Sequence, residues 1–531
     1  MKKKTLTRLL AAALSLSLIF ALSACGNNDA QPNQPDSPPA GAREIVLNLD
    51  GEPSSLNPML MGGGKCANLM ANTLYGFLWR VEYDDTLSCD LAGSYQLDRE
   101  NMVIIAKLRS GLKFADGSPL TAEDVVCSIL TSAADSGSNT SSIDLERTQA
   151  IDETTVQIGL RTLSYATMGD IGSIGIISKA WTEDGSNAEK KSADILASGA
   201  YTIEPWSTGN DMVYVKNPNY WNADKVIYDK ITVKCIADET TRFLDYQNGG
   251  VDLIILAKGE NIDSVENGLV PGTVQILPMQ SVQGLAFDTE NIDTFKNENL
   301  RLAIAHALDV EALVTAYCGP RYGVAQSVYP TSSPYCANTA LKYDPELAKD
   351  YLQKYYDETG ASSVEITLTA KTGGLDATLS EAIQYQLDQV LGIKVNVSVM
   401  DNASYFDAQA KGEQYASIVP LARGHYDPSK YMNAWMPQSS NSIMHMCSDE
   451  LNGLLLETVN NMDLTGEERT AKLAELQKKL TGTGKFVPMF EDFICFALNG
   501  AIASVDGCVS GDGRLLQTLW LSEAPTPLPG G

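Results

Sequence analysis

The chain has 531 residues, of which 44% are hydrophobic and 20% are charged, as in globular proteins of several domains and unlike disordered chains. Its formal net charge is −27 at pH 7. A surface this acidic is repelled by phosphate backbones and anionic lipid headgroups, which argues against nucleic acid as a partner.

The first 24 residues have the features of an export signal. Lysines and Arg8 precede the apolar run Leu9–Leu22, which is shorter than the about 20 residues that a membrane-spanning helix needs. The run ends in Leu-Ser-Ala-Cys, which resembles a bacterial lipobox, in which the cysteine is lipidated and becomes the new N-terminus. Because several acyl chains on one residue give a stable anchor, we expect Cys25 to tether the protein to the outer face of the bacterial cytoplasmic membrane. A plain signal peptide with an incidental cysteine is the alternative.

Residues 25–43 are predicted to be a disordered tether. From Gly26 to Ala42 the chain is rich in Asn, Asp, Gln, Pro, Ser and Gly and has almost no apolar side chains to bury. Such a segment holds a folded body a short distance from the membrane.

Strand and helix patterns alternate through the rest of the chain, which predicts an α/β fold. Alternating or buried apolar runs predict strands at 45–49, 102–108, 155–160, 231–235, 285–288, 366–370 and 393–399. Helical spacing of apolar residues predicts helices after Thr121, within 238–247, over 300–308 and around 381–391.

Local signals set several of the expected boundaries. Thr121 with Asp124 three positions later is typical of a capping box, and Asp309 is suited to cap a further helix. Gly392 is a natural helix stop between the last two expected strands. We also expect a change of strand register near Pro278.

The cysteines and histidines argue against metal sites and catalysis. The chain has 10 cysteines but no Cys-x-x-Cys, so most of them are expected to be small buried hydrophobes, and Cys318–Cys336 is the one disulfide that we consider. The run Met444–Cys447 contains soft metal ligands, but successive residues of a strand face opposite ways, so we expect no metal and no cofactor. No Gly-x-Ser-x-Gly or His-Glu-x-x-His motif occurs, and His306 sits in a helical apolar run, so we expect no enzyme activity.

Six segments, in this order, resemble the extracellular solute-binding proteins of the oligopeptide, dipeptide and nickel group of ABC importers. They are GEPSSLNPML, FADGSPLTAEDVVCSI, ASGAYTIEPWSTGNDMVYVKNPNYW, FDTENIDTFKNENLRLAIAHALDVEALV, YDPELAKDYL and LGIKVNV, and they extend over the whole body. The second resembles the family's D-G-x-P-L-T-A-E-D-V segment, which is highly specific. Within these segments Asp116, Trp221 and Arg301 are expected to support turns and packing, not ligand binding.

The resemblance implies a two-lobed periplasmic-binding-protein-like fold (type II, cluster C) with an extra small domain and a hinge. We expect a discontinuous first lobe, a small domain inserted in it, and a second lobe. Their expected ranges are 44–82 with 198–279 and 484–527 for the first lobe, 83–197 for the small domain and 280–483 for the second lobe.

The resemblance also implies a ligand site between the lobes. In peptide binders of this family an aspartate commonly pairs with the peptide's ammonium, but the corresponding stretch VPLARGHYDPSKYMNAW places Arg423 near that position. An arginine repels an ammonium and binds a carboxylate or phosphate, although a shifted loop would let Asp427 take the ammonium role. The candidate ligand-binding residues are Met61, Gly62, Gly63, Gln283, Gly284, Arg423, Gly424, His425, Tyr426, Asp427, Tyr431 and Trp435.

The expected function is a lipid-anchored, monomeric receptor that captures peptides and delivers them to the permease and ATPase subunits of an ABC importer. Two alternatives stay open on the sequence. Tyr426, Tyr431 and Trp435 offer aromatic surface that also suits an oligosaccharide. Capture of a peptide pheromone at the cell surface is the other alternative.

Overall fold

In the computed structural model, residues 43–531 form one compact unit. The structure describes residues 43–49, 52–53, 56–58, 73–81, 87–135, 140–183, 196–207, 209–372, 375–413, 415–421, 449–459, 461, 463–464, 466–502, 505 and 527–529. The expected leader, lipidated Cys25 and tether lie outside these residues. Within the described part of the chain, no helix is long and apolar enough to cross a membrane.

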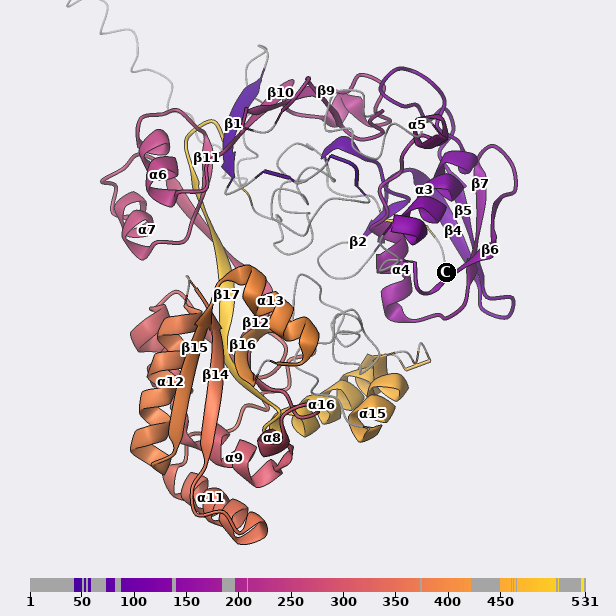
Figure 1. Cartoon of the computed structure of the whole chain (residues 1–531). Helices are drawn as coiled ribbons and strands as arrows, with labels where there is room; N and C mark the ends of the chain where they lie inside the picture. Colours follow the sequence, from indigo (N-terminus) through magenta and orange to yellow (C-terminus); the bar gives the residue numbers. More distant parts are fainter. Residues whose placement is uncertain are drawn as a thin grey trace, which may run out of the picture. The chain divides into compact units, whose positions relative to one another are not determined.

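A mixed nine-stranded sheet runs through the unit in the order β16-β12-β17-β11-β1-β10-β9-β8, with β13 paired to β17 (Figure 1). Its strands are β1 (Glu44–Leu49), β8 (Tyr201–Ile203), β9 (Met212–Lys216), β10 (Lys230–Cys235), β11 (Leu253–Leu256), β12 (Thr273–Phe287), β13 (Gly323–Val324), β16 (Ala416–Pro420) and β17 (Phe486–Leu498). The strands β1, β10 and β11 are parallel, and β12 is antiparallel to both β16 and β17.

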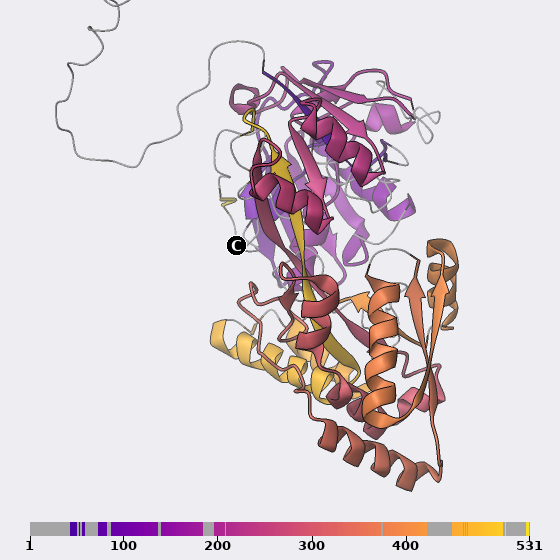
Figure 2. The same cartoon turned by 90° about the vertical axis from the view of Figure 1, so that its left-hand side faces the viewer.

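Three smaller sheets accompany it among the described residues. A four-stranded antiparallel sheet, β4-β5-β7-β6, lies with the short helices of the inserted region, and β2 pairs with β3. These elements are β2 (Trp79–Val81), β3 (Leu87–Cys89), β4 (Ala92–Asp98), β5 (Val103–Leu108), α3 (Ala122–Asp135), β6 (Ile143–Ala150), β7 (Thr155–Leu160), α4 (Tyr165–Gly172) and α5 (Lys179–Glu183). The parallel pair β14 (Glu365–Lys371) and β15 (Lys394–Met400) is connected by α12 (Asp376–Leu391), which lies against both strands (Figure 2).

Most of the remaining elements are helices. They are η2 (Ala223–Lys225), α6 (Glu239–Gln247), α7 (Gly259–Glu266), α8 (Asp293–Lys296), α9 (Glu298–Ala307), α10 (Val310–Leu313), the π-helical turn η3 (Val314–Cys318), α11 (Pro345–Thr359), α13 (Asn402–Lys411), α15 (Asp449–Val459) and α16 (Gly466–Gly482). Helices α6 and α7 lie beside β11 (Figure 1).

The boundary signals read from the sequence act as expected in most cases. The Asp124 carboxylate accepts the backbone N–H of Thr121 at 2.8 Å, which is one half of a capping box at α3. The Asp309 side chain accepts the N–H of Ala312 and caps α10. Gly392 ends α12 in the left-handed conformation, with φ 65°.

The buried side chains divide into two groups. Three clusters of the described core are built from residues before 271 and after 493, and one of these covers the inserted four-stranded sheet. Two further clusters are built from residues 282–490. We call these groups the first and the second lobe. The long strands β12 and β17 belong to both, because each begins in the core of one lobe and ends in that of the other.

The sequence analysis was wrong about a disulfide and missed several strands. Cys318 and Cys336 are free thiols, so the considered disulfide does not form. Each is half-buried among apolar side chains, and burial raises the pKa of the Cys318 thiol to about 11. The strand expected at 285–288 is the end of the much longer β12, and β17 was not expected at all.

Candidate functional site

The carboxyl ends of several strands meet where the sheet passes from one lobe to the other. The β12–β17 ladder pairs Pro278 with Phe493 and Val282 with Glu491, and its register shifts between these pairs. We call the segments 279–281 and 491–492 the crossover. Strand β11 runs toward the crossover from the first lobe, because its last residue pairs with Cys495. Strand β1 is parallel to β11, and β10 is parallel to β1, so both run in the same direction.

Strand β16 approaches the same place from the second lobe. Its last residue, Pro420, pairs with Gln283, directly after the crossover. Ligands of open α/β sheets bind beyond the carboxyl ends of strands, at the point where the strand order changes. The crossover is therefore the candidate ligand site.

The two loops that carry most of the candidate residues start at these strand ends. The loop after β1 leads to Met61, Gly62 and Gly63, and the chain after β16 leads to the stretch from Arg423 to Trp435. All of these candidates, Tyr426 and Asp427 among them, lie outside the described residues. The run Met444–Cys447 lies outside them as well.

Gln283 and Gly284 are the candidates that the structure describes, and both lie in β12 beside the crossover. Gln283 is half-buried and lies opposite Pro420 on one side and Phe490 on the other. A Cβ atom on Gly284 would lie 2.3 Å from the Phe486 ring and 2.6 Å from the Val487 carbonyl oxygen. Gly284 therefore permits close packing at a register shift of the ladder.

The described part of the loop after β1 is held at two points. The Tyr75 hydroxyl donates to the carbonyl oxygen of Leu56 at 2.5 Å, and both residues are fully buried. The Glu52 carboxylate accepts the backbone N–H of Gly209 at 2.8 Å. These contacts fix the base of the loop against the first lobe.

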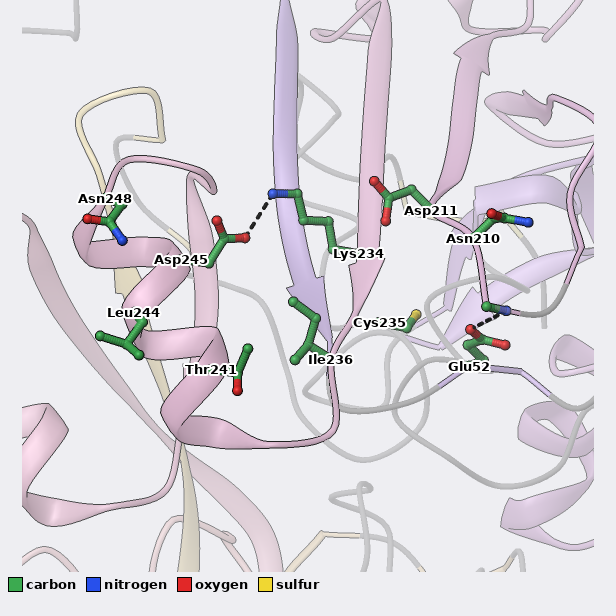
Figure 3. Close-up of a pocket in the computed structure, with 11 residues that line it drawn as sticks. Glu52, Asn210, Asp211, Lys234, Cys235, Ile236, Thr241, Leu244, Asp245 and Asn248 are labelled. Carbon is green, nitrogen blue, oxygen red and sulfur yellow. Dashed lines mark hydrogen bonds and ion pairs between the residues drawn. The ribbon is translucent and has the colours of Figure 1, made fainter.

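A pocket of about 530 Å³ lies at the carboxyl end of β10, between that strand, α6 and Glu52 (Figure 3). The Lys234 ammonium in its wall contacts the Asp245 carboxylate at 2.8 Å and the Gly250 carbonyl at 3.0 Å, so its charge is compensated. Glu52 and Asp211 then leave the pocket with a surplus of negative charge. This electrostatic balance favours a cationic or neutral group over an anion.

The sequence analysis did not single out this pocket. The alternation of β10 placed Lys234 on the face opposite to Ile231 and Val233, and Asp245 is the acidic residue of α6 that meets it. A lysine between Val233 and Cys235 near the end of β10 is the signal that could have found this face. The sequence does not tell which helix Lys234 meets, because its partner Asp245 belongs to α6, a separate element that follows the strand.

The residues expected to be structural are structural. The Trp221 indole N–H donates to Asp90 at 2.9 Å, and the Arg109 guanidinium lies 3.8 Å from the centre of its ring. Asp116 accepts from Ser118 in a turn, and Arg301 donates to three backbone carbonyls. His306 stacks on Tyr351 inside the second lobe and donates from Nδ1 to the Lys342 carbonyl oxygen, away from the crossover. In the described part of the chain, no group of three His, Cys, Asp or Glu side chains could hold a metal.

Comparisons with known proteins agree with this architecture. The model of the bacterial extracellular solute-binding proteins, family 5, matches residues 86–442. The oligopeptide-binding protein OppA of Bacillus subtilis is 23% identical over 511 residues, which cover 88% of this chain and 91% of that protein. The heme-binding protein A of Haemophilus influenzae is 24% identical and covers 89% of this chain and 91% of its own length.

Solved structures show the same fold. The ABC transporter substrate-binding protein CtaP from Listeria monocytogenes superposes with a TM-score of 0.78 at 20% identity, covering 91% of this chain and all of that one. Listeria monocytogenes OppA bound to peptide has a TM-score of 0.71 at 19% identity, with the same coverage. The two-lobed fold, the segments that carry the family pattern and the match of the family model agree: the chain belongs to the bacterial extracellular solute-binding proteins, family 5.

Proposed function

We propose that the protein captures peptides between its two lobes and delivers them to the permease of an ABC importer, without performing chemistry on them. The observation that carries the proposal is the convergence of the carboxyl ends of β1, β10, β11 and β16 at the crossover. A ligand there contacts both lobes, which is what hinge closure requires.

The relatives support peptides as the ligand class. Those similar over most of the chain include oligopeptide- and dipeptide-binding proteins, and a solved neighbour is bound to a peptide. A heme-binding relative of similar identity shows that this fold also serves other solutes.

The mode of recognition that fits the strand ends is backbone pairing. An extended peptide that continues a strand pattern is held by its main chain and tolerates varied side chains. Gln283 lies where such a peptide passes from one lobe to the other, opposite the last residue of β16. The negative pocket at Glu52 supports a ligand with an ammonium or a basic side chain.

We further propose that Asp427 pairs with the peptide ammonium, and that Arg423 faces a carboxylate. Glycines at 62, 63 and 424 let the ligand approach the backbone closely. His425, Tyr426, Tyr431 and Trp435 supply contact surface around the ligand, together with Met61.

Attachment to the membrane completes the proposal. A lipidated Cys25 and the tether at 25–43 hold a monomeric receptor near its transporter, at a raised effective concentration. The proposed domain ranges are those expected from the sequence, except that we place the return to the first lobe within β17. Its residues up to Phe490 pack in the second lobe, and Ile494, Phe496 and Leu498 pack in the first.

Ligand-dependent thermal unfolding tests the proposal. The chain without its leader and Cys25 is heated with pooled di- to hexapeptides, with the same peptides after N-acetylation, and with an oligosaccharide pool. A ligand that binds the folded state raises the melting temperature by mass action, by a free energy of about 2.7 kcal/mol at 100 times the Kd.

We expect peptides to raise the melting temperature and N-acetylation to abolish the rise. Asp427→Asn is expected to weaken binding of free peptides while leaving the unfolding of the unliganded protein unchanged. If only the oligosaccharides raise the melting temperature, the proposal is wrong and the protein is an oligosaccharide receptor. A rise that survives N-acetylation keeps peptides as the ligand but contradicts the role of Asp427.

A further inference from the structure

Two consecutive residues of the second lobe reach across the crossover to the first. The turn that follows η3 places Arg321 and Tyr322 after Gly319, which has a φ of 95°. The next residues, Gly323 and Val324, form β13 and pair with Glu491 and Phe490 at the crossover. The turn is thus fixed to the second lobe at one end and to β17 at the other.

Arg321 contacts the first lobe through α7. One guanidinium nitrogen, Nη2, lies 2.6 Å from Asp263 Oδ1 and 2.6 Å from Glu266 Oε2. The Arg321 side chain is 21% exposed and the two carboxylates 56% and 41%, so the ion pairs are partly shielded from solvent. Helix α7 precedes the crossover in the chain and Arg321 follows it, so these contacts join the lobes independently of the β-ladder.

Tyr322 makes a second contact of the same kind. Its ring lies 5.5 Å from the ring of Phe490 and 4.8 Å from that of Phe493, in edge geometry in both cases. Phe490 belongs to a core cluster of the second lobe, and Phe493 packs against a cluster of the first. A single aromatic ring therefore covers β17 at the point where it changes lobes.

We propose that Arg321 and Tyr322 form a bracket that restrains the relative rotation of the lobes and so tunes the affinity of the interlobe site. The paired residues of the ladder are interrupted at 279–281, where the register shifts, and we expect lobe rotation to be concentrated there. A restraint beside that segment reduces the number of lobe orientations in the unliganded protein. Fewer orientations lower the ordering cost of capturing a ligand. The effect on affinity rests on the proposed function, whereas the restraint itself does not.

Hydrogen–deuterium exchange and small-angle X-ray scattering on the unliganded chain test the restraint. Arg321→Met keeps the length of the side chain and removes the ion pairs, and Tyr322→Leu removes the aromatic contacts. We expect both variants to exchange faster within 259–266 and 279–283 and to broaden the distribution of interatomic distances. Charge reversal of all three partners, Arg321→Glu with Asp263→Lys and Glu266→Lys, is expected to restore slow exchange.

Matched controls come from the same lobe. Lys349→Met removes an ion pair within α11, in which Lys349 Nζ lies 2.8 Å from Glu346, and Tyr385→Leu replaces a tyrosine of α12 that is 66% exposed. Neither control is expected to change exchange at the crossover. The proposal is overturned if Arg321→Met and Tyr322→Leu show the same exchange rates and the same scattering as the two control variants.

Peptide titration then measures the effect on affinity. We expect Kd to rise about three- to tenfold in Arg321→Met, which corresponds to a loss on the order of 1 kcal/mol. Faster exchange with an unchanged Kd contradicts the link between the bracket and affinity. If no peptide binds the unaltered protein, the proposed function fails, and the exchange data still decide whether the bracket exists.

Discussion

At the scale of single residues, the fully buried Asp90 carboxylate joins three segments of the first lobe. It accepts the backbone N–H of Phe77 at 3.0 Å and the indole N–H of Trp221 at 2.9 Å, and it pairs with Arg80 at 3.0 Å. Phe77 lies between β1 and β2, and Trp221 follows β9. A charge that is buried in this way is tolerated because each of its partners compensates for lost hydration.

We predict that Asp90→Ala destabilises the protein by about 3–5 kcal/mol, because Arg80, which is only 8% exposed, loses its carboxylate partner, and the N–H groups of Phe77 and Trp221 lose their acceptor. Trp221→Phe removes one charged hydrogen bond and is expected to cost about 1.5–3 kcal/mol. Urea denaturation measures both. The exposed ion pair of Lys349 and Glu346 is the control, and its removal is expected to cost at most about 1 kcal/mol. If Asp90→Ala also lowers the free energy of unfolding by at most about 1 kcal/mol, the contacts of Asp90 do not have the structural role proposed here.

At the scale of elements, the crossover depends on how closely β12 and β17 approach each other. The ladder between them is continuous on both sides of Pro278–Val282, and a second register shift follows between Gln283 and Gly284. A shift of this kind bends and twists a strand locally. Here it lets a single pair of strands enter the cores of both lobes.

We predict that Gly284→Ala destabilises the protein by about 1–3 kcal/mol, because the added methyl group meets the Phe486 ring and the Val487 carbonyl at less than van der Waals distance. Gly453→Ala is the matched control. Gly453 lies exposed within α15, nothing lies within 4 Å of its added Cβ, and the change is expected to stabilise by about 0.4–1 kcal/mol. Equal effects of the two variants in urea denaturation would argue against close packing at Gly284.

At the scale of the whole molecule, each lobe has its own buried clusters, and among the described elements β12 and β17 pass between them. Because each core is complete within its lobe, a rotation about the crossover leaves the packing of both unchanged. The contacts that span the crossover, including those of Arg321 and Tyr322, then limit the range of lobe orientations.

We predict that a bound peptide reduces the radius of gyration, because the ligand contacts both lobes and selects orientations in which they are close. Small-angle X-ray scattering of the chain without its leader, with and without a saturating peptide, measures the change. A peptide that binds tightly but leaves the scattering curve unchanged contradicts closure by lobe rotation.

Much of the fold could be predicted from local patterns. The β14–α12–β15 unit is found as expected, because its strands alternate, its helix has regular apolar spacing and Gly392 ends that helix. The register change expected near Pro278 is confirmed.

The sequence by itself determined the α/β class, the family and the residues that serve caps, turns and packing, because these depend on short-range patterns and on motifs in a fixed order. Only the tertiary structure decided which strand ends meet at the crossover, that β17 serves both lobes, and that Arg321 reaches Asp263 and Glu266. These features join residues more than 50 positions apart in the chain. Pairing over such distances is set by sheet order and register, and no local pattern records either.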